Sequence, residues 1–253
     1  MSQSEHKPVI EITIAAPIAT VWEALRDPAQ IRRWFGWDAN TLADEIDYIF
    51  VDHVRPDEAA HILAFEGMPD RFELTDLGGG RTRLRLTRLG AAGDESDWDG
   101  PNEDMTEGWK AFLEQLRFAM EHHPGQERRT FYLSGHLAEG ADADLPRAAL
   151  GVDALADLVE DAHYSLKVGP GDTLAGKVWH RSRRQISFSV DGFGDGLVLV
   201  TDFSAQNRPP HGGGSVIVTT YGLDDAAFDA AHGRWAAWWK TNFPEEIKGQ
   251  RLA

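Results

Sequence analysis

Hydrophobic and polar residues alternate with a period of two near the start of the chain and then change to a helical spacing. In VIEITIAAP (9–17), Ile10, Ile12 and Ile14 alternate with polar residues, which predicts a half-buried strand. Pro17 closes this strand, and apolar residues then recur at the i, i+3, i+4 and i+7 positions of a short helix that stops at Asp27. The same spacing over 31–35 predicts a second short helix.

From residue 45 to residue 86 the period returns to two, and glycine-rich turns divide the stretch into pieces. This pattern predicts an antiparallel meander of strands over EIDYIFV (45–51), HILAFE (61–66), RFELTDL (71–77) and RTRLRL (81–86). A long amphipathic helix is predicted over 104–120, where Asp104 and Glu107 fit a capping box. Its apolar face carries Trp109, Phe112, Leu113, Leu116 and Met120.

The rest of the chain repeats this order of elements. Strands are predicted over 129–137, 177–182, 185–190, 196–203 and 215–221, and one or two helices over 145–161. In WAAWWKTNF (235–243), Trp235, Trp238 and Trp239 share one helical face, in the place that Trp109 and Phe112 hold earlier. Periodicity is lost at 122–126, so the sequence predicts an α+β protein with two tandem domains, 1–125 and 126–253.

Composition narrows the class of protein. The chain has no cysteine, which excludes disulfides, thiolate metal sites and thiol nucleophiles and favours a reducing, cytoplasmic location. A net charge of -16 argues against nucleic acid or an anionic membrane as a partner, because phosphate binding needs concentrated Lys and Arg. No run of apolar residues is long enough to span a membrane, and MSQSEHKPV lacks the apolar run of a secretory signal.

Sequence motifs give no convincing catalytic or metal site, and we expect neither cofactor nor metal. GDTLAGKV (171–178) has phosphate-loop spacing, but Val178 replaces the required hydroxyl and a strand-like stretch follows, so a hairpin or loop turn is expected. ESDWDGPNEDMTE (95–107) is similar to a calcium loop, but its twelfth position is Thr106 in place of a bidentate Glu. A solvated loop before the long helix is the simpler interpretation.

Arginines alternate with apolar residues in RTRLRLTR, which places Arg81, Arg83 and Arg85 on one side of a strand. Such arginines form screened surface ion pairs of small individual value, or they dock an acidic partner. The sequence alone leaves both interpretations open.

The first half resembles a known superfamily. IAAPIATVWEALRDPAQIRRWF (14–35), the meander and EGWKAFLEQLRF (107–118) are similar to SRPBCC or START-like domains, the helix-grip fold of the birch pollen allergen. Within it they are most similar to the bacterial branch related to the C-terminal domain of the activator of the heat-shock protein ninety ATPase. The resemblance covers about residues 9–121, whereas the second half matches only in element order and in its Trp-led closing helix. It implies two curved antiparallel sheets, each wrapped around a long C-terminal helix.

In this family the closing helix lies over a hydrophobic cavity, so the resemblance implies two sets of ligand-binding residues. The first set is Trp34, Phe50, Phe65, Phe72, Trp109, Phe112 and Leu116, and the second is His180, Phe188, Phe203, Tyr221, Trp235, Trp238 and Trp239. Each could equally be packed core, since helix and sheet bury apolar surface against each other without any ligand.

Two functions follow from these observations. The first is a non-enzymatic module that binds a small hydrophobic or amphipathic ligand, or acts as a stress- or chaperone-related adaptor with a protein partner. The second is an enzyme, because tandem helix-grip domains also resemble polyketide aromatase/cyclases, which work mainly by cavity shape and a few polar groups. In that case His180, Tyr221 or His232 would perform acid–base chemistry, with His180 and His232 meeting near the second cavity.

Overall fold

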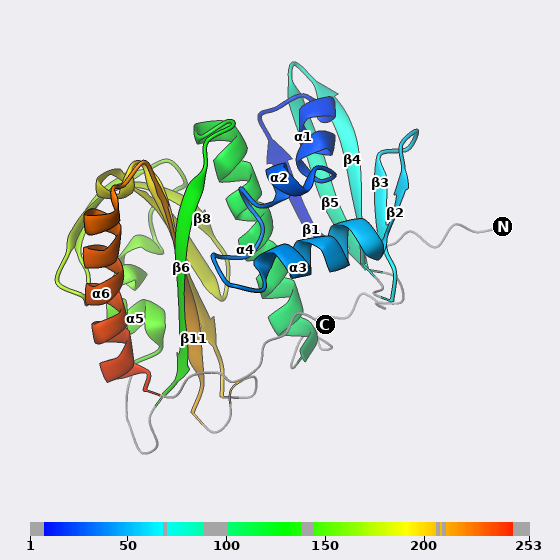
Figure 1. Ribbon diagram of the computed structural model, residues 1–253. Helices are drawn as coiled ribbons and strands as arrows, with labels where there is room; N and C mark the ends of the chain where they lie inside the picture. Colours follow the sequence, from blue (N-terminus) through cyan, green and yellow to red (C-terminus); the bar gives the residue numbers. More distant parts are fainter. Residues whose placement is uncertain are drawn as a thin grey trace. The chain divides into compact units, whose positions relative to one another are not determined.

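The computed structural model describes residues 8–67, 70–88, 101–137, 144–205, 208 and 211–244. The chain folds as two compact units, one formed by 1–98 with 108–126 and the other by 99–107 with 127–253. In each unit a long helix packs on an antiparallel sheet (Figure 1). This arrangement confirms the predicted fold class, an α+β chain with two helix-grip units in tandem.

The first unit is built on a five-stranded antiparallel sheet with the strand order β1-β5-β4-β3-β2. The strands are β1 (Pro8–Ile14), β2 (Val54–Asp57), β3 (Ile62–Phe65), β4 (Asp70–Gly78) and β5 (Arg81–Arg88). One face of this sheet is apolar, because residues such as Ile12, Leu74 and Leu84 alternate with polar ones and are buried. In this strand order the first strand pairs with the last, and the remaining strands follow one another as neighbours from β5 back to β2.

Helices cover the apolar face of this sheet (Figure 1). They are α1 (Ile18–Ala24), α2 (Pro28–Ile31), α3 (Leu42–Ile46) with the π-helix η1 (Asp47–Asp52), and α4 (Pro101–His122). Helix α2 begins after Asp27, whose side chain accepts a 2.9 Å hydrogen bond from the backbone N–H of Ala29.

The strand predicted over 45–51 is wrong, since this stretch is helical. Ile46, Ile49 and Phe50 are buried at positions i, i+3 and i+4, whereas Tyr48 and Val51 are exposed. This spacing is that of a helix packed on the core. The residues of EIDYIFV also fit an alternating pattern, which is why a strand was predicted.

The second unit has a six-stranded sheet with the order β6-β11-β10-β9-β8-β7, so again the first strand pairs with the last. Its strands are β6 (Arg128–His136), β7 (His163–Lys167), β8 (Thr173–Arg181), β9 (Gln185–Val190), β10 (Gly196–Phe203) and β11 (Gly213–Tyr221). Strand β7 is missing from the sequence prediction. The stretch GDTLAGKV lies in the turn between β7 and β8 and in β8 itself, as the expected hairpin.

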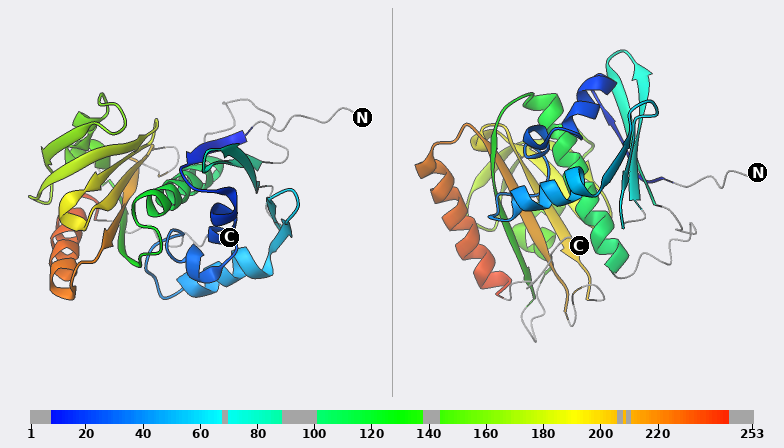
Figure 2. Two further views of the ribbon diagram at one scale, coloured as in Figure 1. Left: turned by 90° about the horizontal axis from the view of Figure 1, so that it is seen from above. Right: turned by 45° about the vertical axis from the view of Figure 1, so that its right-hand side comes forward.

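Two α-helices of the second unit, α5 (Pro146–Leu150) and α6 (Asp225–Asn242), lie on the same face of the six-stranded sheet (Figure 2). Short 3-10 turns follow α5, as η3 (Val152–Leu155), and β9, as η4 (Asp191–Phe193). Asp224 caps α6, because its side chain accepts a 2.8 Å hydrogen bond from the N–H of Ala227. The core of the unit joins these helices to the alternate residues of the strands that face them.

Candidate functional site

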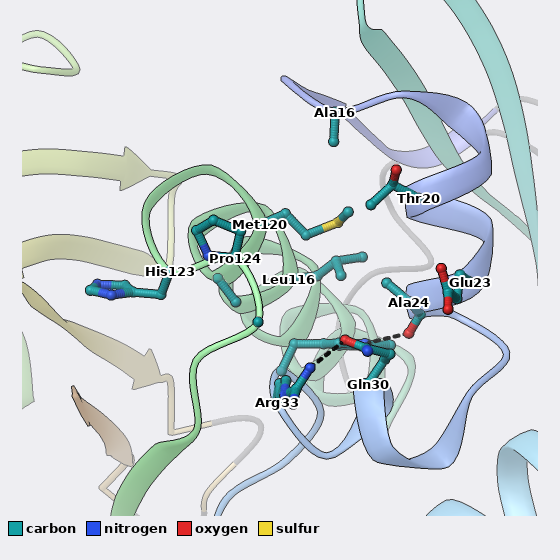
Figure 3. A pocket seen from close by; sticks show the side chains of 13 residues that line it. Ala16, Thr20, Glu23, Ala24, Gln30, Arg33, Leu116, Met120, His123 and Pro124 are labelled. Carbon is teal, nitrogen blue, oxygen red and sulfur yellow. Dashed lines mark hydrogen bonds between the residues drawn. The ribbon is translucent and has the colours of Figure 1, made fainter. Parts of the chain in front are cut away.

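A pocket of about 240 Å³ lies in the first unit, bounded by α1, α2, the C-terminal part of α4 and the turn after α4 (Figure 3). We take it as the candidate site among the residues that the structure describes. Its lining consists of Ala16, Thr20, Glu23, Ala24, Gln30, Arg33, Trp34, Leu116, Ala119, Met120, His123, Pro124 and Gly125.

One side of the pocket is apolar. Leu116 and Met120 are four residues apart on α4, so both side chains point from this helix toward α1, as Figure 3 shows. The positions that face them from α1 and from the end of β1 carry small side chains, Ala24 and Ala16. The pocket exists because these alanines leave a space that a larger apolar residue would fill.

The other side of the pocket is polar. Thr20 and Glu23 lie on α1, and Gln30 and Arg33 come from α2 and the turn that follows it. The guanidinium Nη1 of Arg33 donates a 2.8 Å hydrogen bond to Oε1 of Gln30. Because a cation, a carboxylate, an amide and a hydroxyl surround one space, the pocket can orient a ligand that carries both donors and acceptors.

Two contacts hold the walls of the pocket together. The indole Nε1 of Trp34, a side chain only 1% exposed, donates a 2.9 Å hydrogen bond to the backbone carbonyl of Ala24. This bond fixes the segment after α2 against the end of α1. The backbone N–H of Ala15 donates a 2.8 Å hydrogen bond to Oε1 of Glu121, which ties the end of β1 to α4. Both bonds hold the walls of the pocket in the positions that the structure shows.

His123 contributes to the lining at the end of α4, but its ring points away from Met120 and Leu116 in Figure 3. Its Nδ1 lies 3.3 Å from Oε1 of Gln126. The turn continues through Gly125, whose φ of +76° favours glycine. We therefore assign His123 to the wall of the pocket and not to a reactive position.

The first predicted set divides into two groups. Trp34 and Leu116 line the pocket, whereas Phe50, Phe65, Phe72, Trp109 and Phe112 form an aromatic cluster between α4 and the sheet. Within this cluster Trp109 stacks on Phe65 with ring centroids 5.7 Å apart and meets Phe72 edge-on at 5.1 Å. These rings contact one another as a packed core does.

The three tryptophans of α6 also face the interior of their unit. Trp235 is fully buried and Trp239 is nearly so, and both belong to the core of the second unit. Trp238 is half-buried and packs against the backbone of Gly169, where a Cβ would lie 2.5 Å from the indole ring. Packing against the β7–β8 turn thus accounts for Trp238.

The sheet residues of the second predicted set lie on two different faces. Phe188 belongs to the same core as Trp235. Phe203 and Tyr221 follow core-facing Val200 and Val218 by an odd number of residues, so they point to the opposite face of the sheet. His180 pairs with Ser187, the neighbour of Phe188 in β9, and also lies on that opposite face.

The three acid–base candidates are not brought together. His232 stacks on Phe131 of β6 with ring centroids 4.9 Å apart, and His180 lies on β8. Three strands separate β6 from β8, which corresponds to roughly 19 Å at the usual strand spacing. Burial raises the pKa of Tyr221 to about 12, with nearby Arg128 opposing the shift, so this phenol holds its proton at neutral pH.

A largely buried carboxylate that the sequence did not suggest lies beneath α5. Asp202 of β10 accepts a 3.0 Å hydrogen bond from the backbone N–H of Arg147 in the first turn of α5. Arg147 also pairs with Asp153 at 2.8 Å and donates to the carbonyl of Arg183 at 3.1 Å. Burial raises the pKa of Asp202 to about 6, although Arg147 lowers it. This network anchors α5 to the sheet.

Within the described ranges, no group of three or more His, Cys, Asp and Glu side chains is arranged to hold a metal ion. Residues 95–100 of the calcium-like stretch lie outside those ranges. Among the helices that the structure describes, none is both long and apolar enough to cross a membrane.

No protein-family model and no curated protein sequence matches the chain. Three solved structures are similar over most of its length. DynU16, from the dynemicin biosynthetic locus, is 19% identical and covers 91% of this chain and 93% of its own, with a TM-score of 0.30. The di-domain ARO/CYC proteins BexL, from the BE-7585A pathway, and StfQ, from the steffimycin pathway, are each 12% identical.

BexL covers 94% of this chain and 98% of its own with a TM-score of 0.33. StfQ covers 92% and 93%, with a TM-score of 0.31.

Proposed function

We propose that this protein is a non-enzymatic binding module that holds a small amphipathic ligand in the pocket bounded by α1, α2 and α4. The observation that carries the proposal is the two-sided lining, with Leu116 and Met120 on one side and Thr20, Gln30 and Arg33 on the other. Apolar walls with a few convergent polar groups are the usual composition of a small-molecule site.

The size of the pocket limits the ligand. Its volume of about 240 Å³ is below the roughly 300–1,000 Å³ typical of drug-sized ligands. A single ring with a short polar substituent is therefore the right scale. Met120 has a flexible and polarizable side chain that can adjust to the shape of such a ring.

The test begins with native mass spectrometry of the purified protein, which should reveal a retained small molecule. Binding of benzyl alcohol is then followed through the NMR signal of the Met120 methyl group. Ala24→Leu fills the pocket and should abolish the shift of this signal, whereas Ala230→Leu changes an exposed alanine of α6 and should preserve it. An unchanged Met120 signal in the unsubstituted protein, with no retained ligand, would overturn the proposal.

The narrower proposal, that the first unit belongs to the activator-type branch and serves as a stress- or chaperone-related adaptor, is supported by the pattern in 14–35 alone. Its test is the ATPase rate of a purified bacterial heat-shock protein ninety with and without this protein. A stimulated rate would support the adaptor function, and an unchanged rate with no detectable complex would reject it.

The aromatase/cyclase alternative requires two polar groups within reach of one ligand position. In the second unit His232 lies on the α6 side of the sheet, whereas His180 and Tyr221 lie on the other face. His180 and Tyr221 are also apart, because two strands separate β8 from β11, which corresponds to roughly 14 Å at the usual strand spacing. This separation favours the binding module over the enzyme.

A further inference from the structure

The face of the five-stranded sheet opposite the helices carries an uneven distribution of charge. Arg81, Arg83 and Arg85 of β5 point to this face, because Thr82, Leu84 and Leu86 between them are buried on the other. Arg71 of β4 lies on the same face. The carboxylates that the register places among them are Glu11 of β1 and Glu73 of β4.

Both of these carboxylates are already paired. Glu11 lies 2.5 Å from Nε of Arg85, and Glu73 lies 2.5 Å from Nη2 of Arg71. The charges of Arg85 and Arg71 are therefore balanced by these ion pairs. On β1, β4 and β5 this face carries four arginines against two glutamates, so this part of it is locally positive in a chain whose net charge is -16.

The remaining arginines, Arg81 and Arg83, have no such partner. Among the described residues, no carboxylate lies within ion-pair distance of either guanidinium, and Nε of Arg83 has no hydrogen-bond acceptor. The strands beside Arg83 place Thr13 and Thr75 next to it, and both threonines are exposed. Two cationic forks and two hydroxyls thus meet at the end of the sheet nearest the β4–β5 turn.

We propose that this surface, centred on Arg81 and Arg83, docks an extended acidic segment of a partner protein. The spacing favours a peptide, because residues i and i+2 of a strand are about 6.8 Å apart and carboxylates at alternate positions of an extended peptide repeat at the same distance. A guanidinium fork binds a carboxylate through two parallel hydrogen bonds, and the threonine hydroxyls can donate to the peptide between them.

The strongly negative net charge of the chain does not prevent this contact. At about 0.1 M salt the Debye length is roughly 10 Å, so acidic groups farther from the surface are largely screened. The local excess of two arginines then determines the sign of the charge that an approaching segment meets. Docking of this kind weakens as salt rises, which provides a direct test.

The probe is a synthetic twelve-residue peptide with glutamate at alternate positions, and its control carries glutamine at the same positions. Binding to the full chain is measured by fluorescence anisotropy at low and moderate salt. The glutamate peptide should bind, more weakly at higher salt, and the glutamine peptide should not. Arg81→Gln with Arg83→Gln should weaken binding about tenfold or more, as expected for the loss of two surface ion pairs.

Arg181→Gln with Arg183→Gln is the charge-matched control, because both residues are exposed arginines of the second unit. It should leave the affinity within about twofold of the original. Arg81→Lys with Arg83→Lys keeps the charges but loses the forks, and should give an intermediate affinity. Circular dichroism of each variant verifies the fold.

Three results would overturn the proposal. They are no binding of the glutamate peptide at millimolar concentration, equal binding by the double glutamine variant, and full competition by inorganic phosphate or by anionic vesicles at matched charge. None of these results bears on the pocket of the first unit, whose ligand is measured through Met120 on the other side of the sheet.

Discussion

The indole Nε1 of Trp235 donates a 3.0 Å hydrogen bond to Oδ2 of Asp172, which joins the middle of α6 to the turn between β7 and β8. Trp235 is fully buried, and the other oxygen of Asp172 lies 3.1 Å from Nε of Arg234. The aromatic face of α6 is thus fixed by a polar contact as well as by packing, because a buried indole N–H needs an acceptor.

Asp172→Ala should therefore destabilise the second unit by about 1–3 kcal/mol, the cost of leaving the buried N–H of Trp235 without its acceptor. Urea unfolding monitored by tryptophan fluorescence measures the change. The control is Arg234→Gln, which removes a half-exposed ion pair and should cost at most about 1 kcal/mol. Equal losses in the two variants would contradict the assignment.

A second prediction concerns the first unit, where Arg88 and Asp70 pair across the ends of β5 and β4. Nε and Nη2 of Arg88 lie 2.6 and 2.9 Å from the two carboxylate oxygens of Asp70, whose side chain is 0% exposed. Asp70→Asn should cost about 3 kcal/mol or more, since it removes one member of a buried pair.

The matched control for this change is Glu66→Gln. Glu66 pairs with Arg55 on the surface, where the two side chains are 40% and 78% exposed. We expect a loss of at most about 1 kcal/mol, because water screens such a pair. An Asp70→Asn protein as stable as the Glu66→Gln protein would show that burial adds nothing to the Arg88 contact. Urea midpoints of the two proteins provide the comparison.

Sequence patterns predicted the elements whose buried face has a clear period. The strands over 185–190 and 196–203 and the long helices α4 and α6 lie where alternation or helical spacing placed them. The strand predicted over 45–51 was wrong because Ile46, Ile49 and Phe50 have a helical spacing, although the residues between them also fit an alternating pattern. Local pattern alone cannot decide such a case, since packing on the core selects the helix.

The candidate site was much harder to predict than the fold. The pocket depends on Ala16, Ala24 and Ala119, and a missing side-chain volume leaves no periodic signal in a sequence. Gln30 and Arg33 resemble ordinary surface residues until the turn after α2 places them beside α4. The face of the sheet on which Phe203 and Tyr221 lie could be predicted only with knowledge of the strand register, because a shift of one residue moves a side chain to the other face.

A third prediction follows from the largely buried carboxylate of Asp202. Its pKa is about 6 in the folded protein because of burial, compared with about 3.9 in an unfolded chain. The folded state therefore binds this proton more tightly, so the associated stability is fully present below about pH 4 and is lost as the pH rises through 6. The loss amounts to about 3 kcal/mol over this window.

Asp202→Asn should remove this contribution to the pH dependence, since the amide does not titrate but its oxygen can still accept from the N–H of Arg147. The measurement is the free energy of unfolding from pH 4 to pH 7 for both proteins. The informative quantity is the difference in slope, because other groups titrate equally in each. Parallel curves would show that Asp202 is not the buried titrating group.

The last prediction tests whether Trp238 is held by close approach to the backbone of Gly169. A Cβ at Gly169 would lie 2.5 Å from Cε2 and Cζ2 of the indole, a distance that real Cβ atoms essentially never show. Gly169→Ala must therefore displace the ring and should cost about 1–3 kcal/mol. Gly192→Ala, at a glycine with open space around its Cβ position, should be close to neutral.

A double-mutant cycle separates this contact from any backbone effect of alanine. In a Trp238→Ala background the ring is absent, so Gly169→Ala should cost little, and the coupling free energy should be about 0.5–3 kcal/mol. If Gly169→Ala costs the same with and without the indole, the backbone at 169 and not the aromatic contact is responsible. Because Trp238 stands on the same face of α6 as Trp235 and Trp239, a positive coupling would show that packing inside the unit accounts for the third tryptophan as well.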